Sequence, residues 1–473
     1  MSGPAAAVPP FGFRQVEAFL GRVTDLGAPA DRRSPGRSEA LADVTADVAA
    51  LGLPPGSPVI LAMASGRALL TQYFAVLLNG LVPMPVPPAT PAARLARIGA
   101  EVGAGAMVGA SLAPARFGAT RTVPVGRAQA VGLDNPLTRP PGTVLMATSG
   151  TSGMFSACLH RVDSLLRNAR RHVAAVGLRG DDTILVSLPL YYSYALVAQA
   201  LAAFQTGAAL VLSGPPFSPA DYLAVLDRCA VTASSLTPTS VRVVLAHGAR
   251  FPGGLRMLTV GGDQLGPAQV SRLVAGNPRL ELYLTYGLTE AGPRVATLAA
   301  HAEPASRYAS AGRPLDGVAV SLRPVAGHAG DKGELLVDSD TVLVKKIGGS
   351  GDRTTVRPGV IATGDLFRVD ADGYLYFAGR LSDFVVVRGE KVSLQSVRQL
   401  VQAMQGTLRA STTVRADEAG ETCYDLTVQV APELAAAEQS RRALRRAIFG
   451  QLLPAERPRN VLIEAADLAA FRK

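Results

Sequence analysis

Short apolar runs and helix-length segments alternate along the first two thirds of the chain. Runs typical of buried strands start at Pro58 and Val82 and recur near residues 106–109, 143–147, 183–187 and 282–285. Helical patterns lie between them, at 91–102 and 162–177 for example, and one pattern ends at Asn79-Gly80 with a helix stop signal. This alternation predicts an α/β fold with parallel sheets covered by helices.

The pattern changes near residue 310. Short strands with Gly and Asp turns are predicted at 318–323, 333–337, 359–362 and 374–378, as a β-rich subdomain that closes the large domain. After Arg380 the pattern predicts strands at 384–387, 411–415 and 424–430 and helices from 394 and over 434–450. We therefore expect a large N-terminal domain over residues 1–381 and a small α+β C-terminal domain over residues 382–473.

Composition favours a globular cytoplasmic protein. Of the 473 residues, 48% are hydrophobic, which is enough to bury a large core. No apolar stretch approaches the ~20 residues of a membrane helix. The first residues lack the basic and apolar regions of a signal peptide, so we expect neither secretion nor a membrane partner.

The charged and metal-ligating residues narrow the function classes. The formal charge of +10 comes from dispersed arginines and few lysines, and we interpret it as diffuse surface charge without a nucleic-acid partner. The three cysteines and five histidines show none of the spacings of zinc sites. A structural metal is therefore not expected.

A polar loop directly follows the predicted strand at 143–147. Its residues are Thr148, Ser149, Gly150, Thr151, Ser152 and Gly153. Small residues and hydroxyls expose backbone N–H groups, which suits a polyphosphate ligand. An ordinary Ser/Gly loop remains the alternative interpretation.

Two further motifs carry candidate ligands at predicted strand ends. Tyr286 can stack on a base, Thr289 can bond a phosphate, and Glu290 can hold Mg²⁺ through oxygen. In the second motif, Asp365 can bind both ribose hydroxyls, and Arg380 can bind hydroxyl or phosphate oxygens. Taken singly, the two motifs also fit ordinary turns.

The order of these motifs resembles the adenylate-forming superfamily of acyl-CoA synthetases, aryl-acid adenylation enzymes and amide synthetases. The matching series runs from about residue 50 to the C-terminus as T-S-G-T-S-G, Y-G-L-T-E, T-G-D, G-R-x-x-D and R-G-E-K-V. The resemblance implies an enzyme that activates a carboxylic acid as its acyl-AMP, using ATP and Mg²⁺.

The resemblance also implies a role for each matching residue. The loop from Thr148 to Gly153 would wrap the β- and γ-phosphates, Tyr286 and Gly287 would contact adenine, and Thr289 the α-phosphate. Glu290 would be the metal ligand, and Asp365 with Arg380 would bind the ribose. The small domain would be mobile, turning about Ser382 between half-reactions, and Lys473 would be the catalytic lysine of adenylation.

Two positions depart from the family pattern. Ser156 stands where the phosphate loop usually carries a lysine, and His160 or Arg161 are the nearby candidates to replace its charge. Ser382 stands at a hinge that is usually Asp or Lys. These departures keep open a degenerate nucleotide-binding homologue without turnover.

The resemblance further implies an acyl pocket and an acyl acceptor. The expected pocket residues are Tyr191, Tyr192, Ser193, Tyr194, Gly261, Gly262 and Tyr283. The segment Leu188–Tyr194 has no Asp to pair with an α-ammonium, and its tyrosines suit an aromatic acid or another acid without an α-amino group. The expected acceptor is the thiol of coenzyme A or of phosphopantetheine on a separate carrier protein. An amide synthetase that uses an amine is the alternative.

Overall fold

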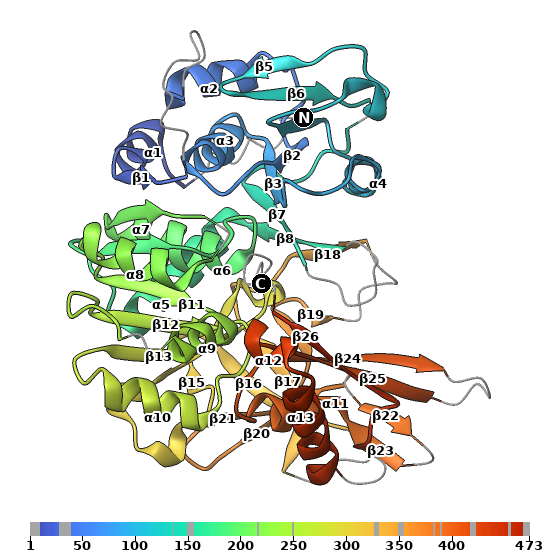
Figure 1. Cartoon of the computed structure of the whole chain (residues 1–473). Helices are drawn as coiled ribbons and strands as arrows, with labels where there is room; N and C mark the ends of the chain where they lie inside the picture. The colour runs from blue at the N-terminus through green and yellow to red at the C-terminus, as the bar shows by residue number, and fades with distance from the viewer. Residues whose placement is uncertain are drawn as a thin grey trace.

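A computed structural model of the chain describes residues 10–27, 39–134, 136–148, 156–214, 217–247, 250–325, 331–348, 354–381, 384–387, 390–416, 422–452 and 456–466. Figure 1 shows the N-terminal layer at the top, a helix-covered sheet below it, and the C-terminal elements at the lower right. Within the described ranges, no helix combines the length and apolar character needed to cross a bilayer.

The N-terminal layer is a mixed sheet with helices packed on it. Its strands, in spatial order, are β3 (Val82–Val86), β2 (Pro58–Ala62), β4 (Ala106–Gly109), β6 (Ala128–Gly132) and β5 (Val123–Val125). The helices of this layer are α2 (Leu41–Ala49), α3 (Arg67–Leu78), α4 (Ala92–Val102) and the short η1 (Pro114–Phe117). β2 pairs in parallel with β3 and β4, whereas β5 and β6 form an antiparallel edge.

The largest sheet lies in the middle layer. Its spatial order is β1 (Val23–Asp25), β10 (Ala209–Leu212), β9 (Thr183–Val186), β11 (Ala233–Leu236), β12 (Met257–Gly261), β13 (Glu281–Gly287), β14 (Arg294–Ala299) and β15 (Arg313–Pro314). In this spatial order, the six strands from β1 through β13 pair in parallel with their neighbours. β14 and β15 add an antiparallel edge.

Helices and short turns accompany this sheet. They are α1 (Phe13–Leu20), α5 (Val162–Val176), α6 (Ser193–Ala195), the π-helical η2 (Leu196–Leu201), α7 (Ala202–Thr206), α8 (Pro219–Arg228), α9 (Pro238–Ala246), α10 (Pro267–Gly276), η3 (Thr289–Ala291), η4 (Ala300–Ala302) and η5 (Ala305–Arg307). Because parallel strands end at the same edge, residues that follow β12 and β13 lie close together, where open α/β sheets bind ligands.

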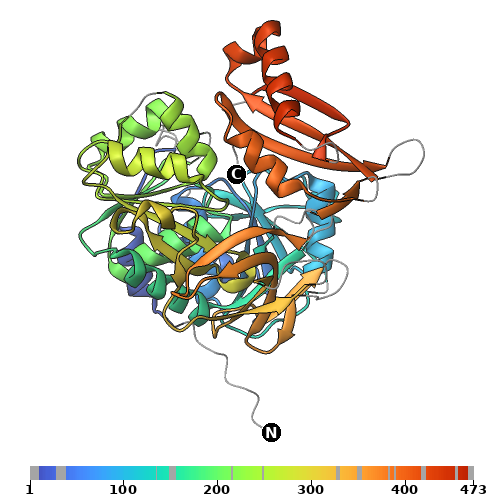
Figure 2. The ribbon, with the colours of Figure 1, turned by 90° about the horizontal axis from the view of Figure 1, so that it is seen from below.

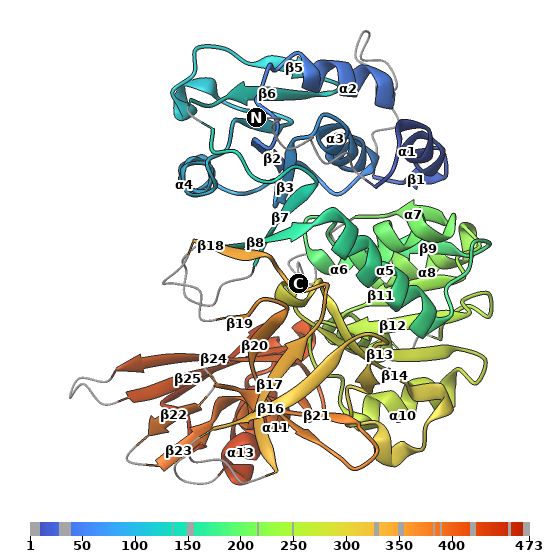
Figure 3. The same cartoon turned by 180° about the vertical axis from the view of Figure 1, so that it is seen from behind.

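A small antiparallel sheet connects these layers to the β-rich segment. It consists of β18 (Lys345–Gly348), β8 (Ser156–Arg161) and β7 (Thr143–Ala147). The β-rich sheet has the order β16 (Ala319–Pro324), β17 (Lys332–Asp338), β20 (Val360–Val369) and β19 (Thr355–Arg357), with β21 (Leu375–Arg380) also on β20. Seen from behind in Figure 3, the strands of the β-rich sheet lie between the largest sheet and the C-terminal elements.

The C-terminal elements pack around a core of their own. The strands are β22 (Phe384–Val387), β23 (Glu390–Ser393), β24 (Thr407–Ala416), β25 (Thr422–Val430) and β26 (Asn460–Ala465), and the helices are α11 (Leu394–Gln402), α12 (Pro432–Ala436) and α13 (Glu438–Gln451). Residues between Val387 and Ile463 form this hydrophobic cluster. Figure 2 shows these elements, coloured orange to red, projecting from one side of the body. We keep residue 382 as the proposed domain boundary.

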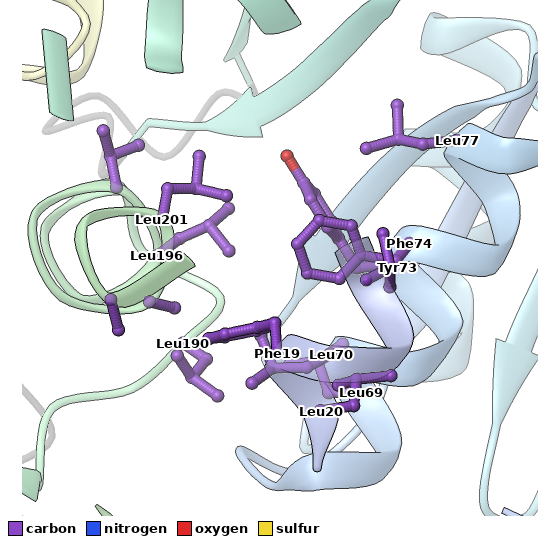
Figure 4. Close-up of a cluster of buried hydrophobic side chains, with 14 of the residues drawn as sticks. Phe19, Leu20, Leu69, Leu70, Tyr73, Phe74, Leu77, Leu190, Leu196 and Leu201 are labelled. Atoms are coloured by element: carbon purple, nitrogen blue, oxygen red, sulfur yellow. The ribbon is translucent and has the colours of Figure 1, made fainter. Parts of the chain in front are cut away.

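One hydrophobic core joins the N-terminal layer to the helices of the middle layer. Tyr73 and Phe74 of α3 are 1% exposed, and Phe74 packs edge-on against Phe19 of α1 with ring centroids 5.8 Å apart. Figure 4 shows this group facing Leu196 and Leu201 of η2. Because α3 is buried from Leu69 to Leu77, it lacks the polar face of a surface helix.

The predicted fold class is confirmed: the chain has parallel sheets covered by helices, a β-rich segment and a smaller α+β part. Several details differ. The segment after the polar loop begins with a strand, β8, because it pairs with β7 and β18. The predicted helix over 434–450 is two helices, interrupted at Ala437, whose backbone is extended. The pattern also missed β26, which pairs in parallel with β25.

Candidate functional site

Three candidate nucleotide-binding residues meet at the carboxyl end of β13. The Tyr286 hydroxyl donates a hydrogen bond of 2.8 Å to Asp365 Oδ2. Arg380 Nε lies 3.1 Å from the other carboxylate oxygen of Asp365. Asp365 is 3% exposed, while the Arg380 side chain is about half exposed. Burial and the carboxylate of Asp365 raise the pKa of Tyr286 well above its ordinary value, so the phenol stays a neutral donor.

The β-rich sheet places Asp365 and Arg380 together. They face each other as a pair between β20 and β21, although fifteen positions separate them in sequence. Gly364 turns the chain just before Asp365 with φ of +73°, and its N–H donates to Glu334 Oε1 at 3.1 Å. The carboxylate of Asp365 is thus fixed beside the aromatic ring of Tyr286. This arrangement suits the hydroxyls of a nucleoside.

Thr289 lies at the centre of the candidate site. Its hydroxyl shares a hydrogen bond of 2.9 Å with Ser193 at the start of α6. Its carbonyl accepts a hydrogen bond of 2.9 Å from His160 Nε2 on β8. Residues from two distant segments, α6 and β8, therefore hold the turn after β13. Gly287 lets this turn form, because a Cβ there would lie 1.9 Å from the carbonyl oxygen of Pro293.

Glu290, the candidate Mg²⁺ ligand, is bound by a lysine that the motifs did not indicate. Lys346 Nζ on β18 lies 3.0 Å from Glu290 Oε1. Lys346 also donates to Thr354 Oγ1 at 3.4 Å. Among the described residues, no group of three His, Cys, Asp or Glu side chains could hold a metal. A single carboxylate fits Mg²⁺ that is bound mainly by nucleotide phosphates.

The central part of the phosphate loop, Ser149–Gly153, lies outside the described residues. Its first residue, Thr148, is described, and its N–H donates to the Ser156 carbonyl at 3.0 Å. The hydroxyls of Thr148 and Ser156 also share a hydrogen bond of 2.5 Å. Ser156 therefore closes the base of the loop, where the family pattern has a lysine.

Neither sequence-based candidate replaces the missing lysine charge. His160 is fully buried, and burial lowers its pKa to about 4, so the ring is neutral at pH 7. Arg161 is exposed and pairs with Asp163 at 3.0 Å. The ammonium group of Lys346 instead lies beside the loop strands, because Lys346 pairs with Cys158 in the register of β18 on β8.

The candidate acyl-pocket tyrosines lie at the start of α6. The rings of Tyr191 and Tyr192 pack edge-on with centroids 4.9 Å apart. Tyr194 OH lies 3.1 Å from Thr259 Oγ1, which in turn lies 2.7 Å from Ser235 Oγ. Tyr194 therefore reaches a line of hydroxyls across the sheet.

Gly261 ends β12 beside this group, and Gly262 follows it. A Cβ at Gly261 would lie 2.3 Å from Thr285 Oγ1, so only glycine fits there. Tyr283 is placed differently from the other candidates. Its hydroxyl donates to Glu281 at 3.2 Å, its ring packs on His301, and burial raises its pKa to about 12. Tyr283 thus turns toward the opposite strand end, and we do not include it in the proposed pocket.

Lys473 and Ser382 lie outside the described residues. The last described residue, Ala466, packs with Leu408 against Val243 of α9. Arg242 Nε of the same helix donates to the Leu408 carbonyl at 3.0 Å. The C-terminal part therefore contacts the large domain through α9.

These features define the class of protein. The family model described as AMP-binding enzyme matches residues 39–344, which is more than half of the chain. The chain therefore belongs to the AMP-binding enzyme family, and the resemblance to adenylate-forming enzymes is confirmed.

Individual relatives are distant in sequence. The chain is 29% identical to a 2-succinylbenzoate–CoA ligase of Bacillus licheniformis over 273 residues, which cover 57% of this chain and 55% of that protein. It is 28% identical to a feruloyl-CoA synthase of Amycolatopsis sp. over 360 residues, 72% of each chain. The o-succinylbenzoate CoA synthetase of Bacillus subtilis, solved with the acyl-adenylate OSB-AMP, matches with a TM-score of 0.75 at 17% identity, covering 95% of this chain and 94% of that one. This likeness confirms the fold.

Proposed function

We propose that this chain activates a carboxylic acid with ATP, forming an acyl-AMP and releasing pyrophosphate. The observation that carries the proposal is the place of Thr289, which follows Tyr286 by three residues and binds Ser193. The Tyr286–Asp365–Arg380 cluster is the first group, and Ser193 with the tyrosines of α6 is the second. A nucleoside at the first group and an acid at the second would meet at Thr289.

The reaction needs no base, because a carboxylate is already nucleophilic at neutral pH. One carboxylate oxygen bonds to the α-phosphorus while the bond to the bridging oxygen breaks, and pyrophosphate leaves. Hydroxyls of Thr289 and Ser193 are positioned to donate to the oxygens that gain charge, and Lys346 adds a cation nearby. Bound Mg²⁺ would neutralise phosphate charge beside Glu290.

The proposed acid is aromatic, or another acid without an α-amino group. Tyr191, Tyr192 and Tyr194 supply aromatic surface at the start of α6, and the segment from Leu188 to Tyr194 has no carboxylate for an ammonium group. The names of the relatives, 2-succinylbenzoate–CoA ligase and feruloyl-CoA synthase, support an aromatic acid. They also support coenzyme A, or a carrier-bound phosphopantetheine, as the thiol acceptor.

The test measures pyrophosphate release across a panel of carboxylic acids with ATP and Mg²⁺ and without an acceptor. We expect release with aromatic acids and none with α-amino acids. Coenzyme A, a phosphopantetheinyl carrier protein and simple amines are then added in separate reactions, and mass spectrometry identifies the acyl product. Amide formation without any thioester would replace the thiol acceptor with an amine. If protein that still binds ATP released no pyrophosphate with any acid of the panel, adenylation would be rejected.

Lys473 remains the proposed catalytic lysine. We expect Lys473→Ala to slow adenylation while transfer from supplied acyl-AMP persists, because a lysine beside the α-phosphate acts only in the first step. Equal loss in both half-reactions would instead indicate damage to the C-terminal domain.

A further inference from the structure

Arg294 is a buried cation beside the candidate acyl pocket that no motif indicated. It is 3% exposed, at the start of β14. In the part of the chain that the structure describes, no carboxylate forms an ion pair with it, and its Nε and Nη2 atoms have no hydrogen-bond partner. Burial lowers the pKa of Arg294, and the Tyr194 side chain partly offsets this effect. Burial without a counter-charge is unfavourable for a guanidinium, which nevertheless stays protonated.

The surrounding residues hold this side chain in one place. Asn168 of α5 binds the backbone of Arg294 twice, accepting from its N–H and donating to its carbonyl, both at 2.9 Å. Arg294 Nη1 donates to Thr285 Oγ1 at 2.9 Å. The Thr285 hydroxyl can accept this bond because it donates its own hydrogen to the Val260 carbonyl.

The guanidinium lies against the same groups that form the candidate acyl pocket. Its Cζ is 3.7 Å from the ring centroid of Tyr194, which is half-buried. On the sheet side, a Cβ at Gly261 would lie 3.2 Å from Arg294 Nη1. Aromatic stacking and the hydroxyl of Thr285 therefore occupy one face and one donor of Arg294, and the absence of a side chain at Gly261 lets Arg294 approach β12 closely.

The two donors without partners share one edge of the guanidinium. Nε and Nη2 point their hydrogens in parallel, which is the fork that binds both oxygens of a carboxylate. A buried, pre-positioned fork of this kind gains most from an anion, because the ligand supplies both the missing charge and the missing acceptors.

We propose that Arg294 selects acids that carry a second carboxylate, which binds the Nε–Nη2 fork while the first carboxylate is activated at Thr289. This inference rests on the proposed adenylation reaction and names its substrate class. It makes Arg294 a specificity residue, separate from the nucleotide cluster around Asp365.

The test compares acids that differ only in the second carboxylate. Benzoate is compared with phthalate, isophthalate and terephthalate, phenylacetate with homophthalate, and butyrate with succinate and glutarate. We expect at least one dicarboxylate to exceed its monoacid by about 100-fold in kcat/KM for pyrophosphate release. Arg294→Met, which keeps the length of the side chain without the fork, should reduce this ratio to about 1. Arg294→Lys should retain part of it.

A binding measurement separates this inference from the proposed reaction. Calorimetric titration of the same acids, with a non-hydrolysable ATP analogue and Mg²⁺ present, should show tighter binding of a dicarboxylate to the wild type but not to Arg294→Met. The exposed Arg313→Met is the matched control and should behave as the wild type. Selective binding without any pyrophosphate release would reject adenylation but support the role of Arg294.

Two results would overturn the inference. One is equal binding and turnover of the monoacids and dicarboxylates by the wild type. The other is a dicarboxylate preference that survives in Arg294→Met. Thermal unfolding checks that the variant folds, and a purely structural role would lower its stability without changing the ratio between paired acids.

Discussion

At the residue scale, the Asp365 side chain binds two other candidate site residues at once. It accepts from Tyr286 and pairs with Arg380 while almost fully buried, so its carboxylate is held in one orientation before a nucleotide arrives. Charge-assisted hydrogen bonds from a fixed carboxylate are the stronger kind. Asp365 thereby also orients the aromatic ring of Tyr286.

We expect Asp365→Ala to raise the apparent KM for ATP by about 10- to 100-fold, because hydrogen bonds to a charged group contribute ~1.5–3 kcal/mol each. Steady-state pyrophosphate release at varied ATP measures the change. Asp338→Ala, which removes an exposed carboxylate paired with Arg357, is the control. An unchanged KM for ATP would remove Asp365 from the nucleotide site.

Lys346 gives a second prediction at this scale. Its ammonium lies 3.0 Å from Glu290 and beside the loop strands, where Ser156 leaves no cation. We expect Lys346→Met to weaken the binding of ATP by roughly tenfold and the binding of AMP much less, because AMP lacks the β- and γ-phosphates.

Equilibrium titration of both nucleotides measures this difference. The neighbouring Lys345 is exposed and points to the other side of β18, so Lys345→Met is a close control. An equal loss of ATP and AMP affinity in Lys346→Met would contradict a role for Lys346 at the outer phosphates.

At the element scale, the turn between β13 and β14 carries the candidate site. Tyr286 lies at the end of β13, Thr289 and Glu290 lie on the turn, and Arg294 begins β14. Gly287 pairs with Arg294 at an irregular point of the ladder. The close approach of β13 and β14 at Gly287 thus links the candidate nucleotide and acyl sites.

We expect Gly287→Ala to abolish adenylation and to destabilise the fold by roughly 1–3 kcal/mol, because the added methyl group must displace the Pro293 carbonyl. Chemical denaturation and ATP titration measure the two effects. Gly276 in α10 has open space around its Cβ position, so Gly276→Ala should be neutral or slightly stabilising. Normal ATP binding by Gly287→Ala would show that the turn tolerates a side chain.

The element pattern was read correctly for several buried segments. The strands at Pro58 and Val82 and the helix over 162–177 are typical cases, because their apolar residues already have the period of the element. β8 and β26 were missed, since their strand conformation depends on partners from other segments. The break at Ala437 was missed because no glycine or proline marks it.

At the scale of the whole molecule, α5 connects the layers. It packs against η2 and β14, and it carries His172 toward Arg294. Burial, and then the charge of Arg294, lower the pKa of His172 to about 3. Folding therefore requires a neutral imidazole at this position at all but very acidic pH.

We expect this histidine to make stability depend on pH. An unfolded histidine titrates near 6.5, so the unfolded state binds more protons between about pH 6.5 and pH 3. Its contribution is fully present above pH 6.5 and falls by roughly 1.4 kcal/mol per pH unit between about pH 6 and 4.

Urea denaturation at several pH values measures this slope. His172→Leu should reduce the slope but not abolish it, because burial also lowers the pKa of His160 to about 4. The same substitution at the exposed His247 should leave the slope unchanged. An identical pH dependence in wild type and His172→Leu would mean that other groups control acid unfolding.

The order of local motifs was enough to identify the family and to propose Tyr286, Thr289, Glu290, Asp365 and Arg380 as candidate site residues, because each motif is set by residue type within a short segment. Pairings between distant segments were not accessible in this way. Lys346 meets Glu290 across 56 positions, and Arg294 meets Tyr194 across a hundred. Both depend on strand register and on the absence of water around the charge, which only the packed tertiary structure decides.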